Sequence, residues 1–247
     1  MITELVGAAG AGKTQFCLTL VVQCFLPETK GGFGANSGVV YIDTERKFSA
    51  QRLQQIAKAR APEFYDQRYC SEGIDNLRRL LDNTFVKDVD DSNKLLQFLN
   101  GIQPLLICGN KRLIILDSVA HLARKDFSAE MFREKQEALV DQAVLLKKIA
   151  ETFKIVVVVT NQVTVRFGSD VYQVGIENSE YNENSFLAPA LGNTWHHCVS
   201  NRLVLNNAVN STSTSDSKLN TLTLSKSPIA PQIEGNYTIC KEGIVMD

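Results

Sequence analysis

The stretch GAAGAGKT at residues 7–14, which follows the apolar run 2–6, decides how this chain folds. It has the G-x-x-x-x-G-K-[ST] pattern of a phosphate-binding loop, in which glycines turn backbone N–H groups toward phosphate oxygens. In this pattern Lys13 reaches the β- and γ-phosphates and Thr14 offers its hydroxyl to Mg²⁺. Residues 15–26 are apolar at helical spacing, and a helix there points its N-terminus at the same phosphates. Strand, loop and helix follow in the order that a nucleoside triphosphate site requires, which disfavours a glycine-rich turn with a chance Lys-Thr pair.

The composition describes an ordinary soluble globular chain. Its 247 residues are 44% hydrophobic and 21% charged, with a net charge of −1. This length suits one α/β domain over 1–247, and the charge balance confines any DNA contact to a local basic patch. We expect no membrane partner and an intracellular protein, since no apolar run approaches a membrane span and no leader-like segment precedes the loop.

The six cysteines, at 17, 24, 70, 108, 198 and 240, show no C-x-x-C pair and no zinc-ligand spacing. We expect most of them to be small buried hydrophobes in a reducing compartment. Cys17 and Cys24 lie seven residues apart and therefore share one face of the first helix.

Three further apolar runs, 39–42, 113–116 and 155–159, read as strands buried on both faces of a parallel sheet. Each run ends in polar residues, and the carboxyl ends of parallel strands form the edge where α/β proteins bind ligands. These residues are Asp43, Thr44 and Glu45 after the first run, Asp117 after the second, and Thr160, Asn161 and Gln162 after the third.

Three of these side chains predict a hydrolytic site around one γ-phosphate. Asp117 suits Mg²⁺ held through water, and Glu45 suits a base that deprotonates a water in line with the phosphate. Gln162 suits a γ-phosphate sensor, although a solvated strand-end amide is the simpler interpretation of it alone. The lid arginines of a small-molecule kinase and the Asn-Lys-x-Asp guanine reader of a GTPase are not found.

The rest of the chain predicts alternating helices and strands, then antiparallel strands. Residues 163–190 have no period, and so long an irregular stretch indicates a functional loop or a disordered insertion. The other expected elements are a surface connection at 27–38, a helix at 49–61 capped by Ser49 and stopped by Pro62, a strand at 67–70, helical structure at 75–108 broken by a solvated loop at 87–91, a helix at 129–153, a hairpin of 202–205 with 219–224, and a strand at 237–240 followed by a strand or short hairpin at the end.

These motifs together resemble the ATPase core of the eukaryotic RecA-type recombinases over nearly the whole chain. The resemblance implies a RecA-like P-loop NTPase of the α/β class, with a mostly parallel central sheet flanked by helices and antiparallel C-terminal strands. The Trp195 motif with Arg202-Leu203, and residues 226–231, are most similar to the B-type recombinase paralogue. The matching segments are 7–14, 39–45 with Phe48 and Arg52-Leu53, 116–118, 160–163 and 191–195.

The resemblance implies ATP and Mg²⁺ as cofactors and assigns roles to individual residues. Catalysis would fall to Glu45, Lys13 and Gln162, and metal binding to Thr14 and Asp117. His197 lies near the end of a second DNA-binding loop, 163–190, which Gln162 would link to the nucleotide. The residues expected to bind ATP are Gly7, Gly10, Ala11, Gly12, Lys13, Thr14, Gln15 and Arg52, the last packed on the adenine; those expected to face DNA are Arg124, Lys125 and Phe127.

The sequence also departs from the recombinase pattern. The long loop sets one cation, Arg166, against four acidic residues, and Ser128-Ala129-Glu130 replaces the usual glycine and cation, so autonomous strand exchange is disfavoured. Lys226 stands where strand-exchange members carry an acidic residue, in a segment that caps a neighbour's ATP; a cation there suits the neighbour's γ-phosphate. The family's helical N-terminal domain is expected to be absent. The four acidic residues are Asp170, Glu177, Glu180 and Glu183.

We therefore expect a nuclear, DNA-dependent ATPase that is one subunit of a heteromeric recombinase-paralogue complex in homologous recombination and double-strand-break repair. Its partners would be other paralogue subunits and, through the complex, single-stranded or branched DNA. One alternative is an assembly scaffold that binds ATP and scarcely hydrolyses it. A third, less favoured, is an autonomous strand-exchange filament protein.

Overall fold

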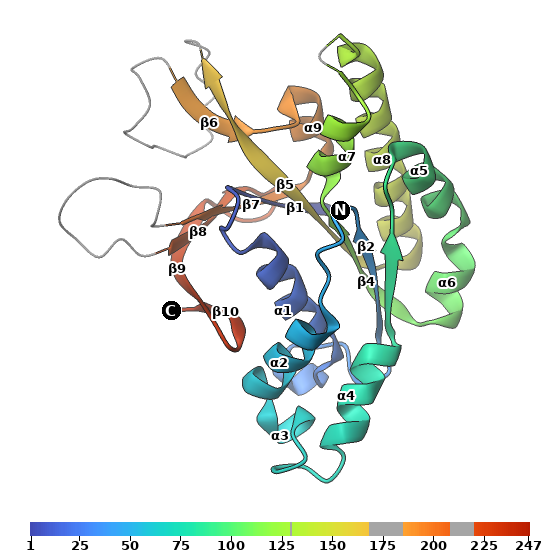
Figure 1. The fold of residues 1–247 in the computed structure, drawn as a ribbon, viewed down its shortest axis with the longest axis vertical. Coiled ribbons are helices and arrows are strands. Elements are labelled where there is room, and N and C mark those ends of the chain that lie inside the picture. Colours follow the sequence, from blue (N-terminus) through green and yellow to red (C-terminus); the bar gives the residue numbers. More distant parts are fainter. Residues whose placement is uncertain (129, 168–184, 208–219) are drawn as a thin grey trace, which may run out of the picture.

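The computed structural model describes residues 1–128, 130–167, 185–207 and 220–247, and its strands join in one ten-stranded sheet (Figure 1). The strand order is β10-β9-β8-β7-β1-β5-β4-β2-β3, with β6 paired to β5. The six strands from β7 to β3 run parallel; β8, β9 and β10 are added antiparallel, as is β6. The strands are β1 (Ile2–Gly7), β2 (Gly38–Asp43), β3 (Thr84–Asp88), β4 (Lys111–Asp117), β5 (Val156–Phe167), β6 (Ser185–Pro189), β7 (Asn201–Asn206), β8 (Asn220–Lys226), β9 (Ile233–Cys240) and β10 (Gly243–Met246).

Helices cover both faces of the parallel part of the sheet. One core holds side chains of α1 (Lys13–Phe25), α2 (Ala50–Arg60), α3 (Pro62–Tyr65) and α4 (Gly73–Asp82). The other holds those of α5 (Ser92–Gly101), α6 (Gln103–Cys108), α7 (Val119–Lys125), α8 (Phe132–Phe153) and α9 (Gly192–Cys198); a short 3-10 turn, η1, spans Glu28–Lys30. The expected α/β class is confirmed.

The alternation of side chains along each strand explains why two cores form. In β2, Val39 and Tyr41 face α1 and α2, whereas Val40 and Ile42 face the α5 to α9 side. Because successive residues of a strand point to opposite faces, an uninterrupted apolar run is the sequence of a strand covered on both sides. None of the described helices is both long and apolar enough to cross a membrane.

The register of the parallel strands gathers the candidate residues at one edge of the sheet. Gly7 of β1 lies beside Gln162 of β5, and Asp43 of β2 lies beside Asp117 of β4. Gly7, Asp43 and Asp117 end their strands, and Gln162 ends the parallel pairing of β5 with β1. This is the edge at which parallel sheets bind ligands.

The C-terminal strands hold the phosphate-binding loop from one side. The Tyr237 hydroxyl of β9 donates to the Ala11 carbonyl at 2.7 Å, and the Ile244 amide of β10 donates to Thr19 Oγ1 of α1 at 3.1 Å. Gly12 has a φ of 95°, which strains any other residue, and an added Cβ would lie 2.7 Å from Ile239 Cδ1, so that side chain would also have to shift. Residues more than two hundred positions apart thus shape one loop.

Two expectations between residues 61 and 108 are wrong. Residues 67–70 form a turn, not a strand, because the Asp66 carboxylate accepts both the Arg68 amide and its guanidinium. The helical stretch expected at 75–108 is interrupted by strand β3, so its break is not simply a solvated loop at 87–91. Pro62 ends α2 as expected but also begins α3, a position that tolerates proline because its N–H would be unpaired.

Two further boundaries differ from expectation. Strand β5 continues through Gln162 to Phe167 and pairs with β6, so both ends of the irregular stretch 163–190 are ordered strands. The helix expected at 129–153 begins only at Phe132, and α7 precedes it as a separate helix. The centre of the long loop, with its four acidic residues, and most of the expected 206–217 hairpin tip lie outside the described residues.

The cysteines match expectation only in part. All six are free thiols, but only Cys17 and Cys24 are buried; Cys108 and Cys240 are exposed. Cys17 and Cys24 are buried because their seven-residue spacing places both on the inner face of α1.

A buried ion pair holds the sheet together beneath the site. Arg202 of β7 and Glu4 of β1 lie fully inside the protein, with Arg202 Nε 2.6 Å from Glu4 Oε2. Glu4 Oε1 accepts hydrogen bonds from Trp195 Nε1 at 2.8 Å and Asn161 Nδ2 at 2.7 Å, and Arg202 Nη1 donates to His196 Nδ1 at 2.7 Å. Burial, together with the charges of Arg202 and Lys226, lowers the pKa of His196 to about 4, which keeps its ring neutral and able to accept.

We predict that Glu4→Gln lowers the free energy of unfolding by about 3 kcal/mol or more, because it leaves the Arg202 guanidinium buried beside a neutral amide. Urea denaturation monitored by circular dichroism measures the loss. The matched control is Glu137→Gln in the exposed pair with Arg133 on α8, which should cost less than about 1 kcal/mol. Equal losses in the two variants would contradict the importance of the buried pair.

Candidate functional site

The phosphate-binding loop is formed, and its lysine is held by the loop itself. Gly10 and Gly12 adopt the left-handed region, with φ of 82° and 95°. Lys13 Nζ donates to the carbonyls of Gly7 and Ala8, both at 2.8 Å. Burial lowers the pKa of Lys13, although the carboxylates of Asp117 and Glu45 act in the opposite direction. The ammonium therefore stands in the loop beside two carboxylates.

Asp117 is fixed by three hydroxyl groups from three other elements. Its Oδ2 accepts from Thr14 Oγ1 and from the Tyr41 hydroxyl, each at 2.8 Å, and its Oδ1 accepts from Thr160 Oγ1 at 2.6 Å. Burial, reinforced by the nearby carboxylate, raises the pKa of Tyr41 well above its usual range, so the phenol remains a donor.

The pairing of Thr14 with Asp117 fits a magnesium site. A hydroxyl and a carboxylate are hard oxygen ligands, and Mg²⁺ is usually held by one or two carboxylates with substrate phosphates and waters. Within the described residues no group of three or more His, Cys, Asp or Glu side chains is placed to hold a metal.

Asp43 folds the loop that carries Glu45. Its carboxylate accepts the amide of Glu45 at 3.1 Å and that of Phe48 at 2.7 Å, closing a turn between them. Arg46 inside this turn has a φ of 57°, which is uncommon for a residue other than glycine. The Phe48 ring then packs edge-on against Tyr41 at 5.0 Å between centroids, so the loop is anchored to the buried strand β2.

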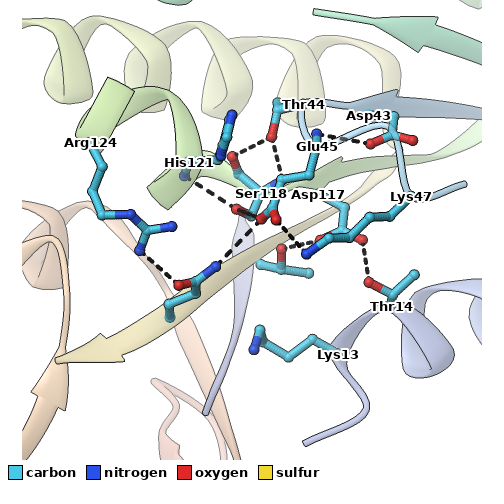
Figure 2. Close-up of polar contacts among 12 residues, drawn as sticks. Lys13, Thr14, Asp43, Thr44, Glu45, Lys47, Asp117, Ser118, His121 and Arg124 are labelled. Carbon is cyan, nitrogen blue, oxygen red and sulfur yellow. Dashed lines mark hydrogen bonds and ion pairs between the residues drawn. The ribbon is translucent and has the colours of Figure 1, made fainter. Parts of the chain in front are cut away.

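Both oxygens of the Glu45 carboxylate accept hydrogen bonds (Figure 2). Ser118 Oγ donates to Oε1 at 2.9 Å, Gln162 Nε2 approaches the same oxygen at 3.5 Å, and Lys47 Nζ donates to Oε2 at 2.5 Å. Burial favours the neutral acid, but the hydrogen bonds from Lys47 and Ser118 outweigh it and lower the pKa of Glu45.

Gln162 connects Glu45 to helix α7. Arg124 Nη1 donates to the side-chain oxygen Oε1 of Gln162 at 2.8 Å. The backbone N–H of Gln162 donates to Asn161 Oδ1, also at 2.8 Å. Figure 2 shows the resulting chain from the Arg124 guanidinium through the amide to the Glu45 carboxylate. An exposed arginine that was expected to face DNA therefore also contacts the expected sensor.

The other expected DNA-facing residues do not join Arg124 in one cluster of contacts. Lys125 Nζ donates to the Asp90 carbonyl at 2.5 Å, at the start of α5, and Phe127 is half-buried beyond the end of α7. The structure thus places Lys125 against a neighbouring loop and only Arg124 against the nucleotide-facing residues.

Arg52 and Gln15, two of the residues expected to bind ATP, contact each other. Arg52 Nε donates to Gln15 Oε1 at 2.8 Å, and Nη2 donates to the Cys240 carbonyl at 2.6 Å. The guanidinium therefore links α2 and α1 to the hairpin of β9 and β10 on one side of the phosphate-binding loop.

Lys226 and His197 lie together at α9. Lys226 Nζ donates to the carbonyls of His196 and Val199, at 2.6 and 2.8 Å, and so satisfies the last turn of α9, where cations are favourable. His197 is exposed, and its ring lies edge-on to that of His196. Within this chain the Lys226 ammonium, at the end of β8, therefore binds the C-terminal carbonyls of α9.

The sequence did not reveal two contacts that shape the site. Tyr41 reads as part of a buried apolar strand, and only the fold shows that its hydroxyl reaches Asp117. Lys47 reads as an exposed loop lysine, because its contact with Glu45 depends on the left-handed turn at Arg46. The one hint in the sequence for Tyr41 was a hydroxyl-bearing residue near the carboxyl end of an otherwise apolar strand. The sequence held no comparable hint for Lys47.

Comparisons with known proteins agree with the motifs. The profile of the family described as Rad51 matches residues 1–247. DNA repair protein RAD51 homolog 2 of Homo sapiens is 34% identical over 99% of this chain and 63% of its own length, and DNA repair protein XRCC3 of Mus musculus is 32% identical over 98% and 68%. The chain thus spans less than two thirds of the human relative. The likeness to RecA-type recombinases and their B-type paralogue is confirmed, and the chain belongs to the Rad51 family.

Proposed function

We propose that the chain is an ATP-binding subunit that hydrolyses ATP with Mg²⁺. The observation that carries this proposal is the convergence of four groups at one sheet edge: Lys13 in the phosphate-binding loop, Thr14 bonded to Asp117, and Glu45 bonded through Ser118 to the strand that carries Asp117. A loop for phosphates, a pair of hard oxygens for the metal and a carboxylate base are the parts that phosphoryl transfer to water needs.

Each residue has a defined task in this mechanism. Lys13 exchanges its two carbonyl acceptors for phosphate oxygens and offsets their charge. Thr14 and Asp117 would hold Mg²⁺, which supplies further positive charge to the phosphates. Glu45 takes the proton of the attacking water onto its carboxylate, and Ser118 and Gln162 orient that carboxylate.

The biological setting is proposed from the relatives. The two compared above are DNA repair proteins by name, which supports a role in homologous recombination and double-strand-break repair, in the nucleus and within a heteromeric paralogue complex. DNA would be single-stranded or branched and would meet the complex near Arg124, whose contact with Gln162 offers a route from DNA to the nucleotide. We retain residues 1–247 as one domain in this proposal.

A scaffold that binds ATP and scarcely hydrolyses it is the second candidate. The ion pair between Glu45 and Lys47 favours it, because a carboxylate bonded to an ammonium is a weaker base. Autonomous strand exchange stays less favoured, since the acidic composition of the long loop opposes phosphate binding.

We predict that Lys13→Ala weakens binding of Mg²⁺-ATP roughly 30- to 100-fold, because hydrogen bonds to charged groups contribute about 1.5–3 kcal/mol each. Isothermal titration calorimetry gives the dissociation constant. Lys148→Ala, an exposed lysine of α8, is the control and should bind as the unsubstituted protein does. Equal affinity in both variants would mean that the phosphate-binding loop is misassigned.

We predict that Glu45→Gln retains ATP binding but lowers single-turnover hydrolysis by about 10²- to 10⁴-fold, the usual contribution of a positioned base. The control is Glu134→Gln, an exposed glutamate of α8. Undiminished hydrolysis in Glu45→Gln would exclude Glu45 as the base. Stabilisation by ATP without measurable turnover in the unsubstituted protein, and turnover only with partner subunits, would instead favour the scaffold.

A further inference from the structure

Lys47 forms an ion pair with the residue proposed as the base. Its ammonium lies 2.5 Å from Glu45 Oε2, and the other oxygen already accepts from Ser118 Oγ and lies 3.5 Å from Gln162 Nε2. The Glu45 side chain is 15% exposed and that of Lys47 is 59% exposed, so the pair sits at the mouth of the site. In this arrangement no oxygen of the carboxylate is left without a donor.

The loop is built to hold this contact. The Asp43 carboxylate binds the amides of Glu45 and Phe48, which bracket Lys47, and Arg46 takes the left-handed conformation that reverses the chain between Glu45 and Lys47. Most exposed ion pairs contribute little because two long side chains must be ordered. Here one partner is shielded and the backbone is already fixed at both ends of the turn.

The charges around Glu45 make Lys47 the principal cation acting on it. Lys13 on α1 and His121 on α7 also face the carboxylate, while the Arg124 charge reaches it only through Gln162. Lys47 also acts on Lys13, because its positive charge is one of the causes that lower the pKa of Lys13. Lys47 therefore lies within electrostatic reach of both the base and the loop that receives phosphate.

A cation bonded to a general base reduces catalysis in two ways. It stabilises the ionised carboxylate, so the carboxylate takes a proton less readily, and it occupies the oxygen that would accept that proton.

We propose that Lys47 is a positioning residue that restrains Glu45, so that ATP is held bound and hydrolysed slowly. The inference rests on the proposed role of Glu45 as the base. The restraint would reconcile the ATPase with the scaffold that scarcely hydrolyses ATP. The same site hydrolyses ATP, and the ion pair sets how long the bound nucleotide persists.

The test is single-turnover hydrolysis of Mg²⁺-ATP by Lys47→Gln and Lys47→Arg. We expect Lys47→Gln to hydrolyse roughly threefold faster, because removing the cation raises the pKa of Glu45 and a stronger base takes the proton of the attacking water more readily. Lys47→Arg keeps the cation and should remain slow. Lys30→Gln removes the exposed ion pair with Glu63 and serves as the matched control, with an unchanged rate.

The pH dependence separates this role from a merely structural one. Glu45 acts as the ionised base, and its pKa lies below the usual value, so the rate falls only at low pH. In Lys47→Gln the acidic limb of the rate profile should move to higher pH, and carbon-13 NMR of the labelled Glu45 carboxyl should show the same rise in pKa. The Lys47→Arg and Lys30→Gln proteins should show neither change.

Three outcomes overturn the proposal, and only the third also overturns the proposed function of Glu45. A slower Lys47→Gln protein, or an unchanged Glu45 pKa, would show that Lys47 does not restrain the base, while the loss of hydrolysis in Glu45→Gln would leave the proposed function standing. Full hydrolysis by Glu45→Gln would instead reject the base itself, and the restraint with it.

Discussion

The Asp117 carboxylate is the constraint on which the site depends. It accepts hydroxyl hydrogen bonds from Thr14, Tyr41 and Thr160, which belong to α1, β2 and β5. Because the donors belong to separate elements, these hydrogen bonds fix the positions of those elements relative to one another. The end of the loop helix and the ends of three neighbouring strands are therefore positioned by one side chain, which is also the one that suits Mg²⁺.

A second buried network supports the same edge from beneath. Glu4 binds Arg202, Trp195 and Asn161, and Asn161 in turn accepts the Gln162 amide. Such a network leaves few alternatives for the backbone, because breaking any one bond strands a buried polar group. Gln162 thus has a fixed backbone, while its side-chain amide reaches both Glu45 and Arg124.

Local pattern predicted those parts of the fold that local chemistry determines. The glycines and Lys13 define the phosphate-binding loop, and apolar runs ending in Asp117 or Glu45 define buried strands and their functional ends. Strand β3 was not predicted because it is a five-residue edge strand that is largely exposed. Its sequence, TFVKD, does not alternate apolar and polar residues as a strand with one buried face would. The extension of β5 depends on pairing with β6, and the contact of Lys47 with Glu45 depends on the turn at Arg46; both are set by distant or conformational features that residue type does not encode.

The central claim is that Lys13, Thr14 with Asp117, and Glu45 surround one γ-phosphate. A structure of the protein bound to a non-hydrolysable ATP analogue and Mg²⁺ tests it most directly. The account predicts the Lys13 ammonium on the β- and γ-phosphate oxygens, the metal beside Thr14 and Asp117, and the Glu45 carboxylate facing the γ-phosphate within reach of a single bridging water. A nucleotide whose γ-phosphate points away from Glu45, or one bound outside the loop of residues 7–14, would contradict it.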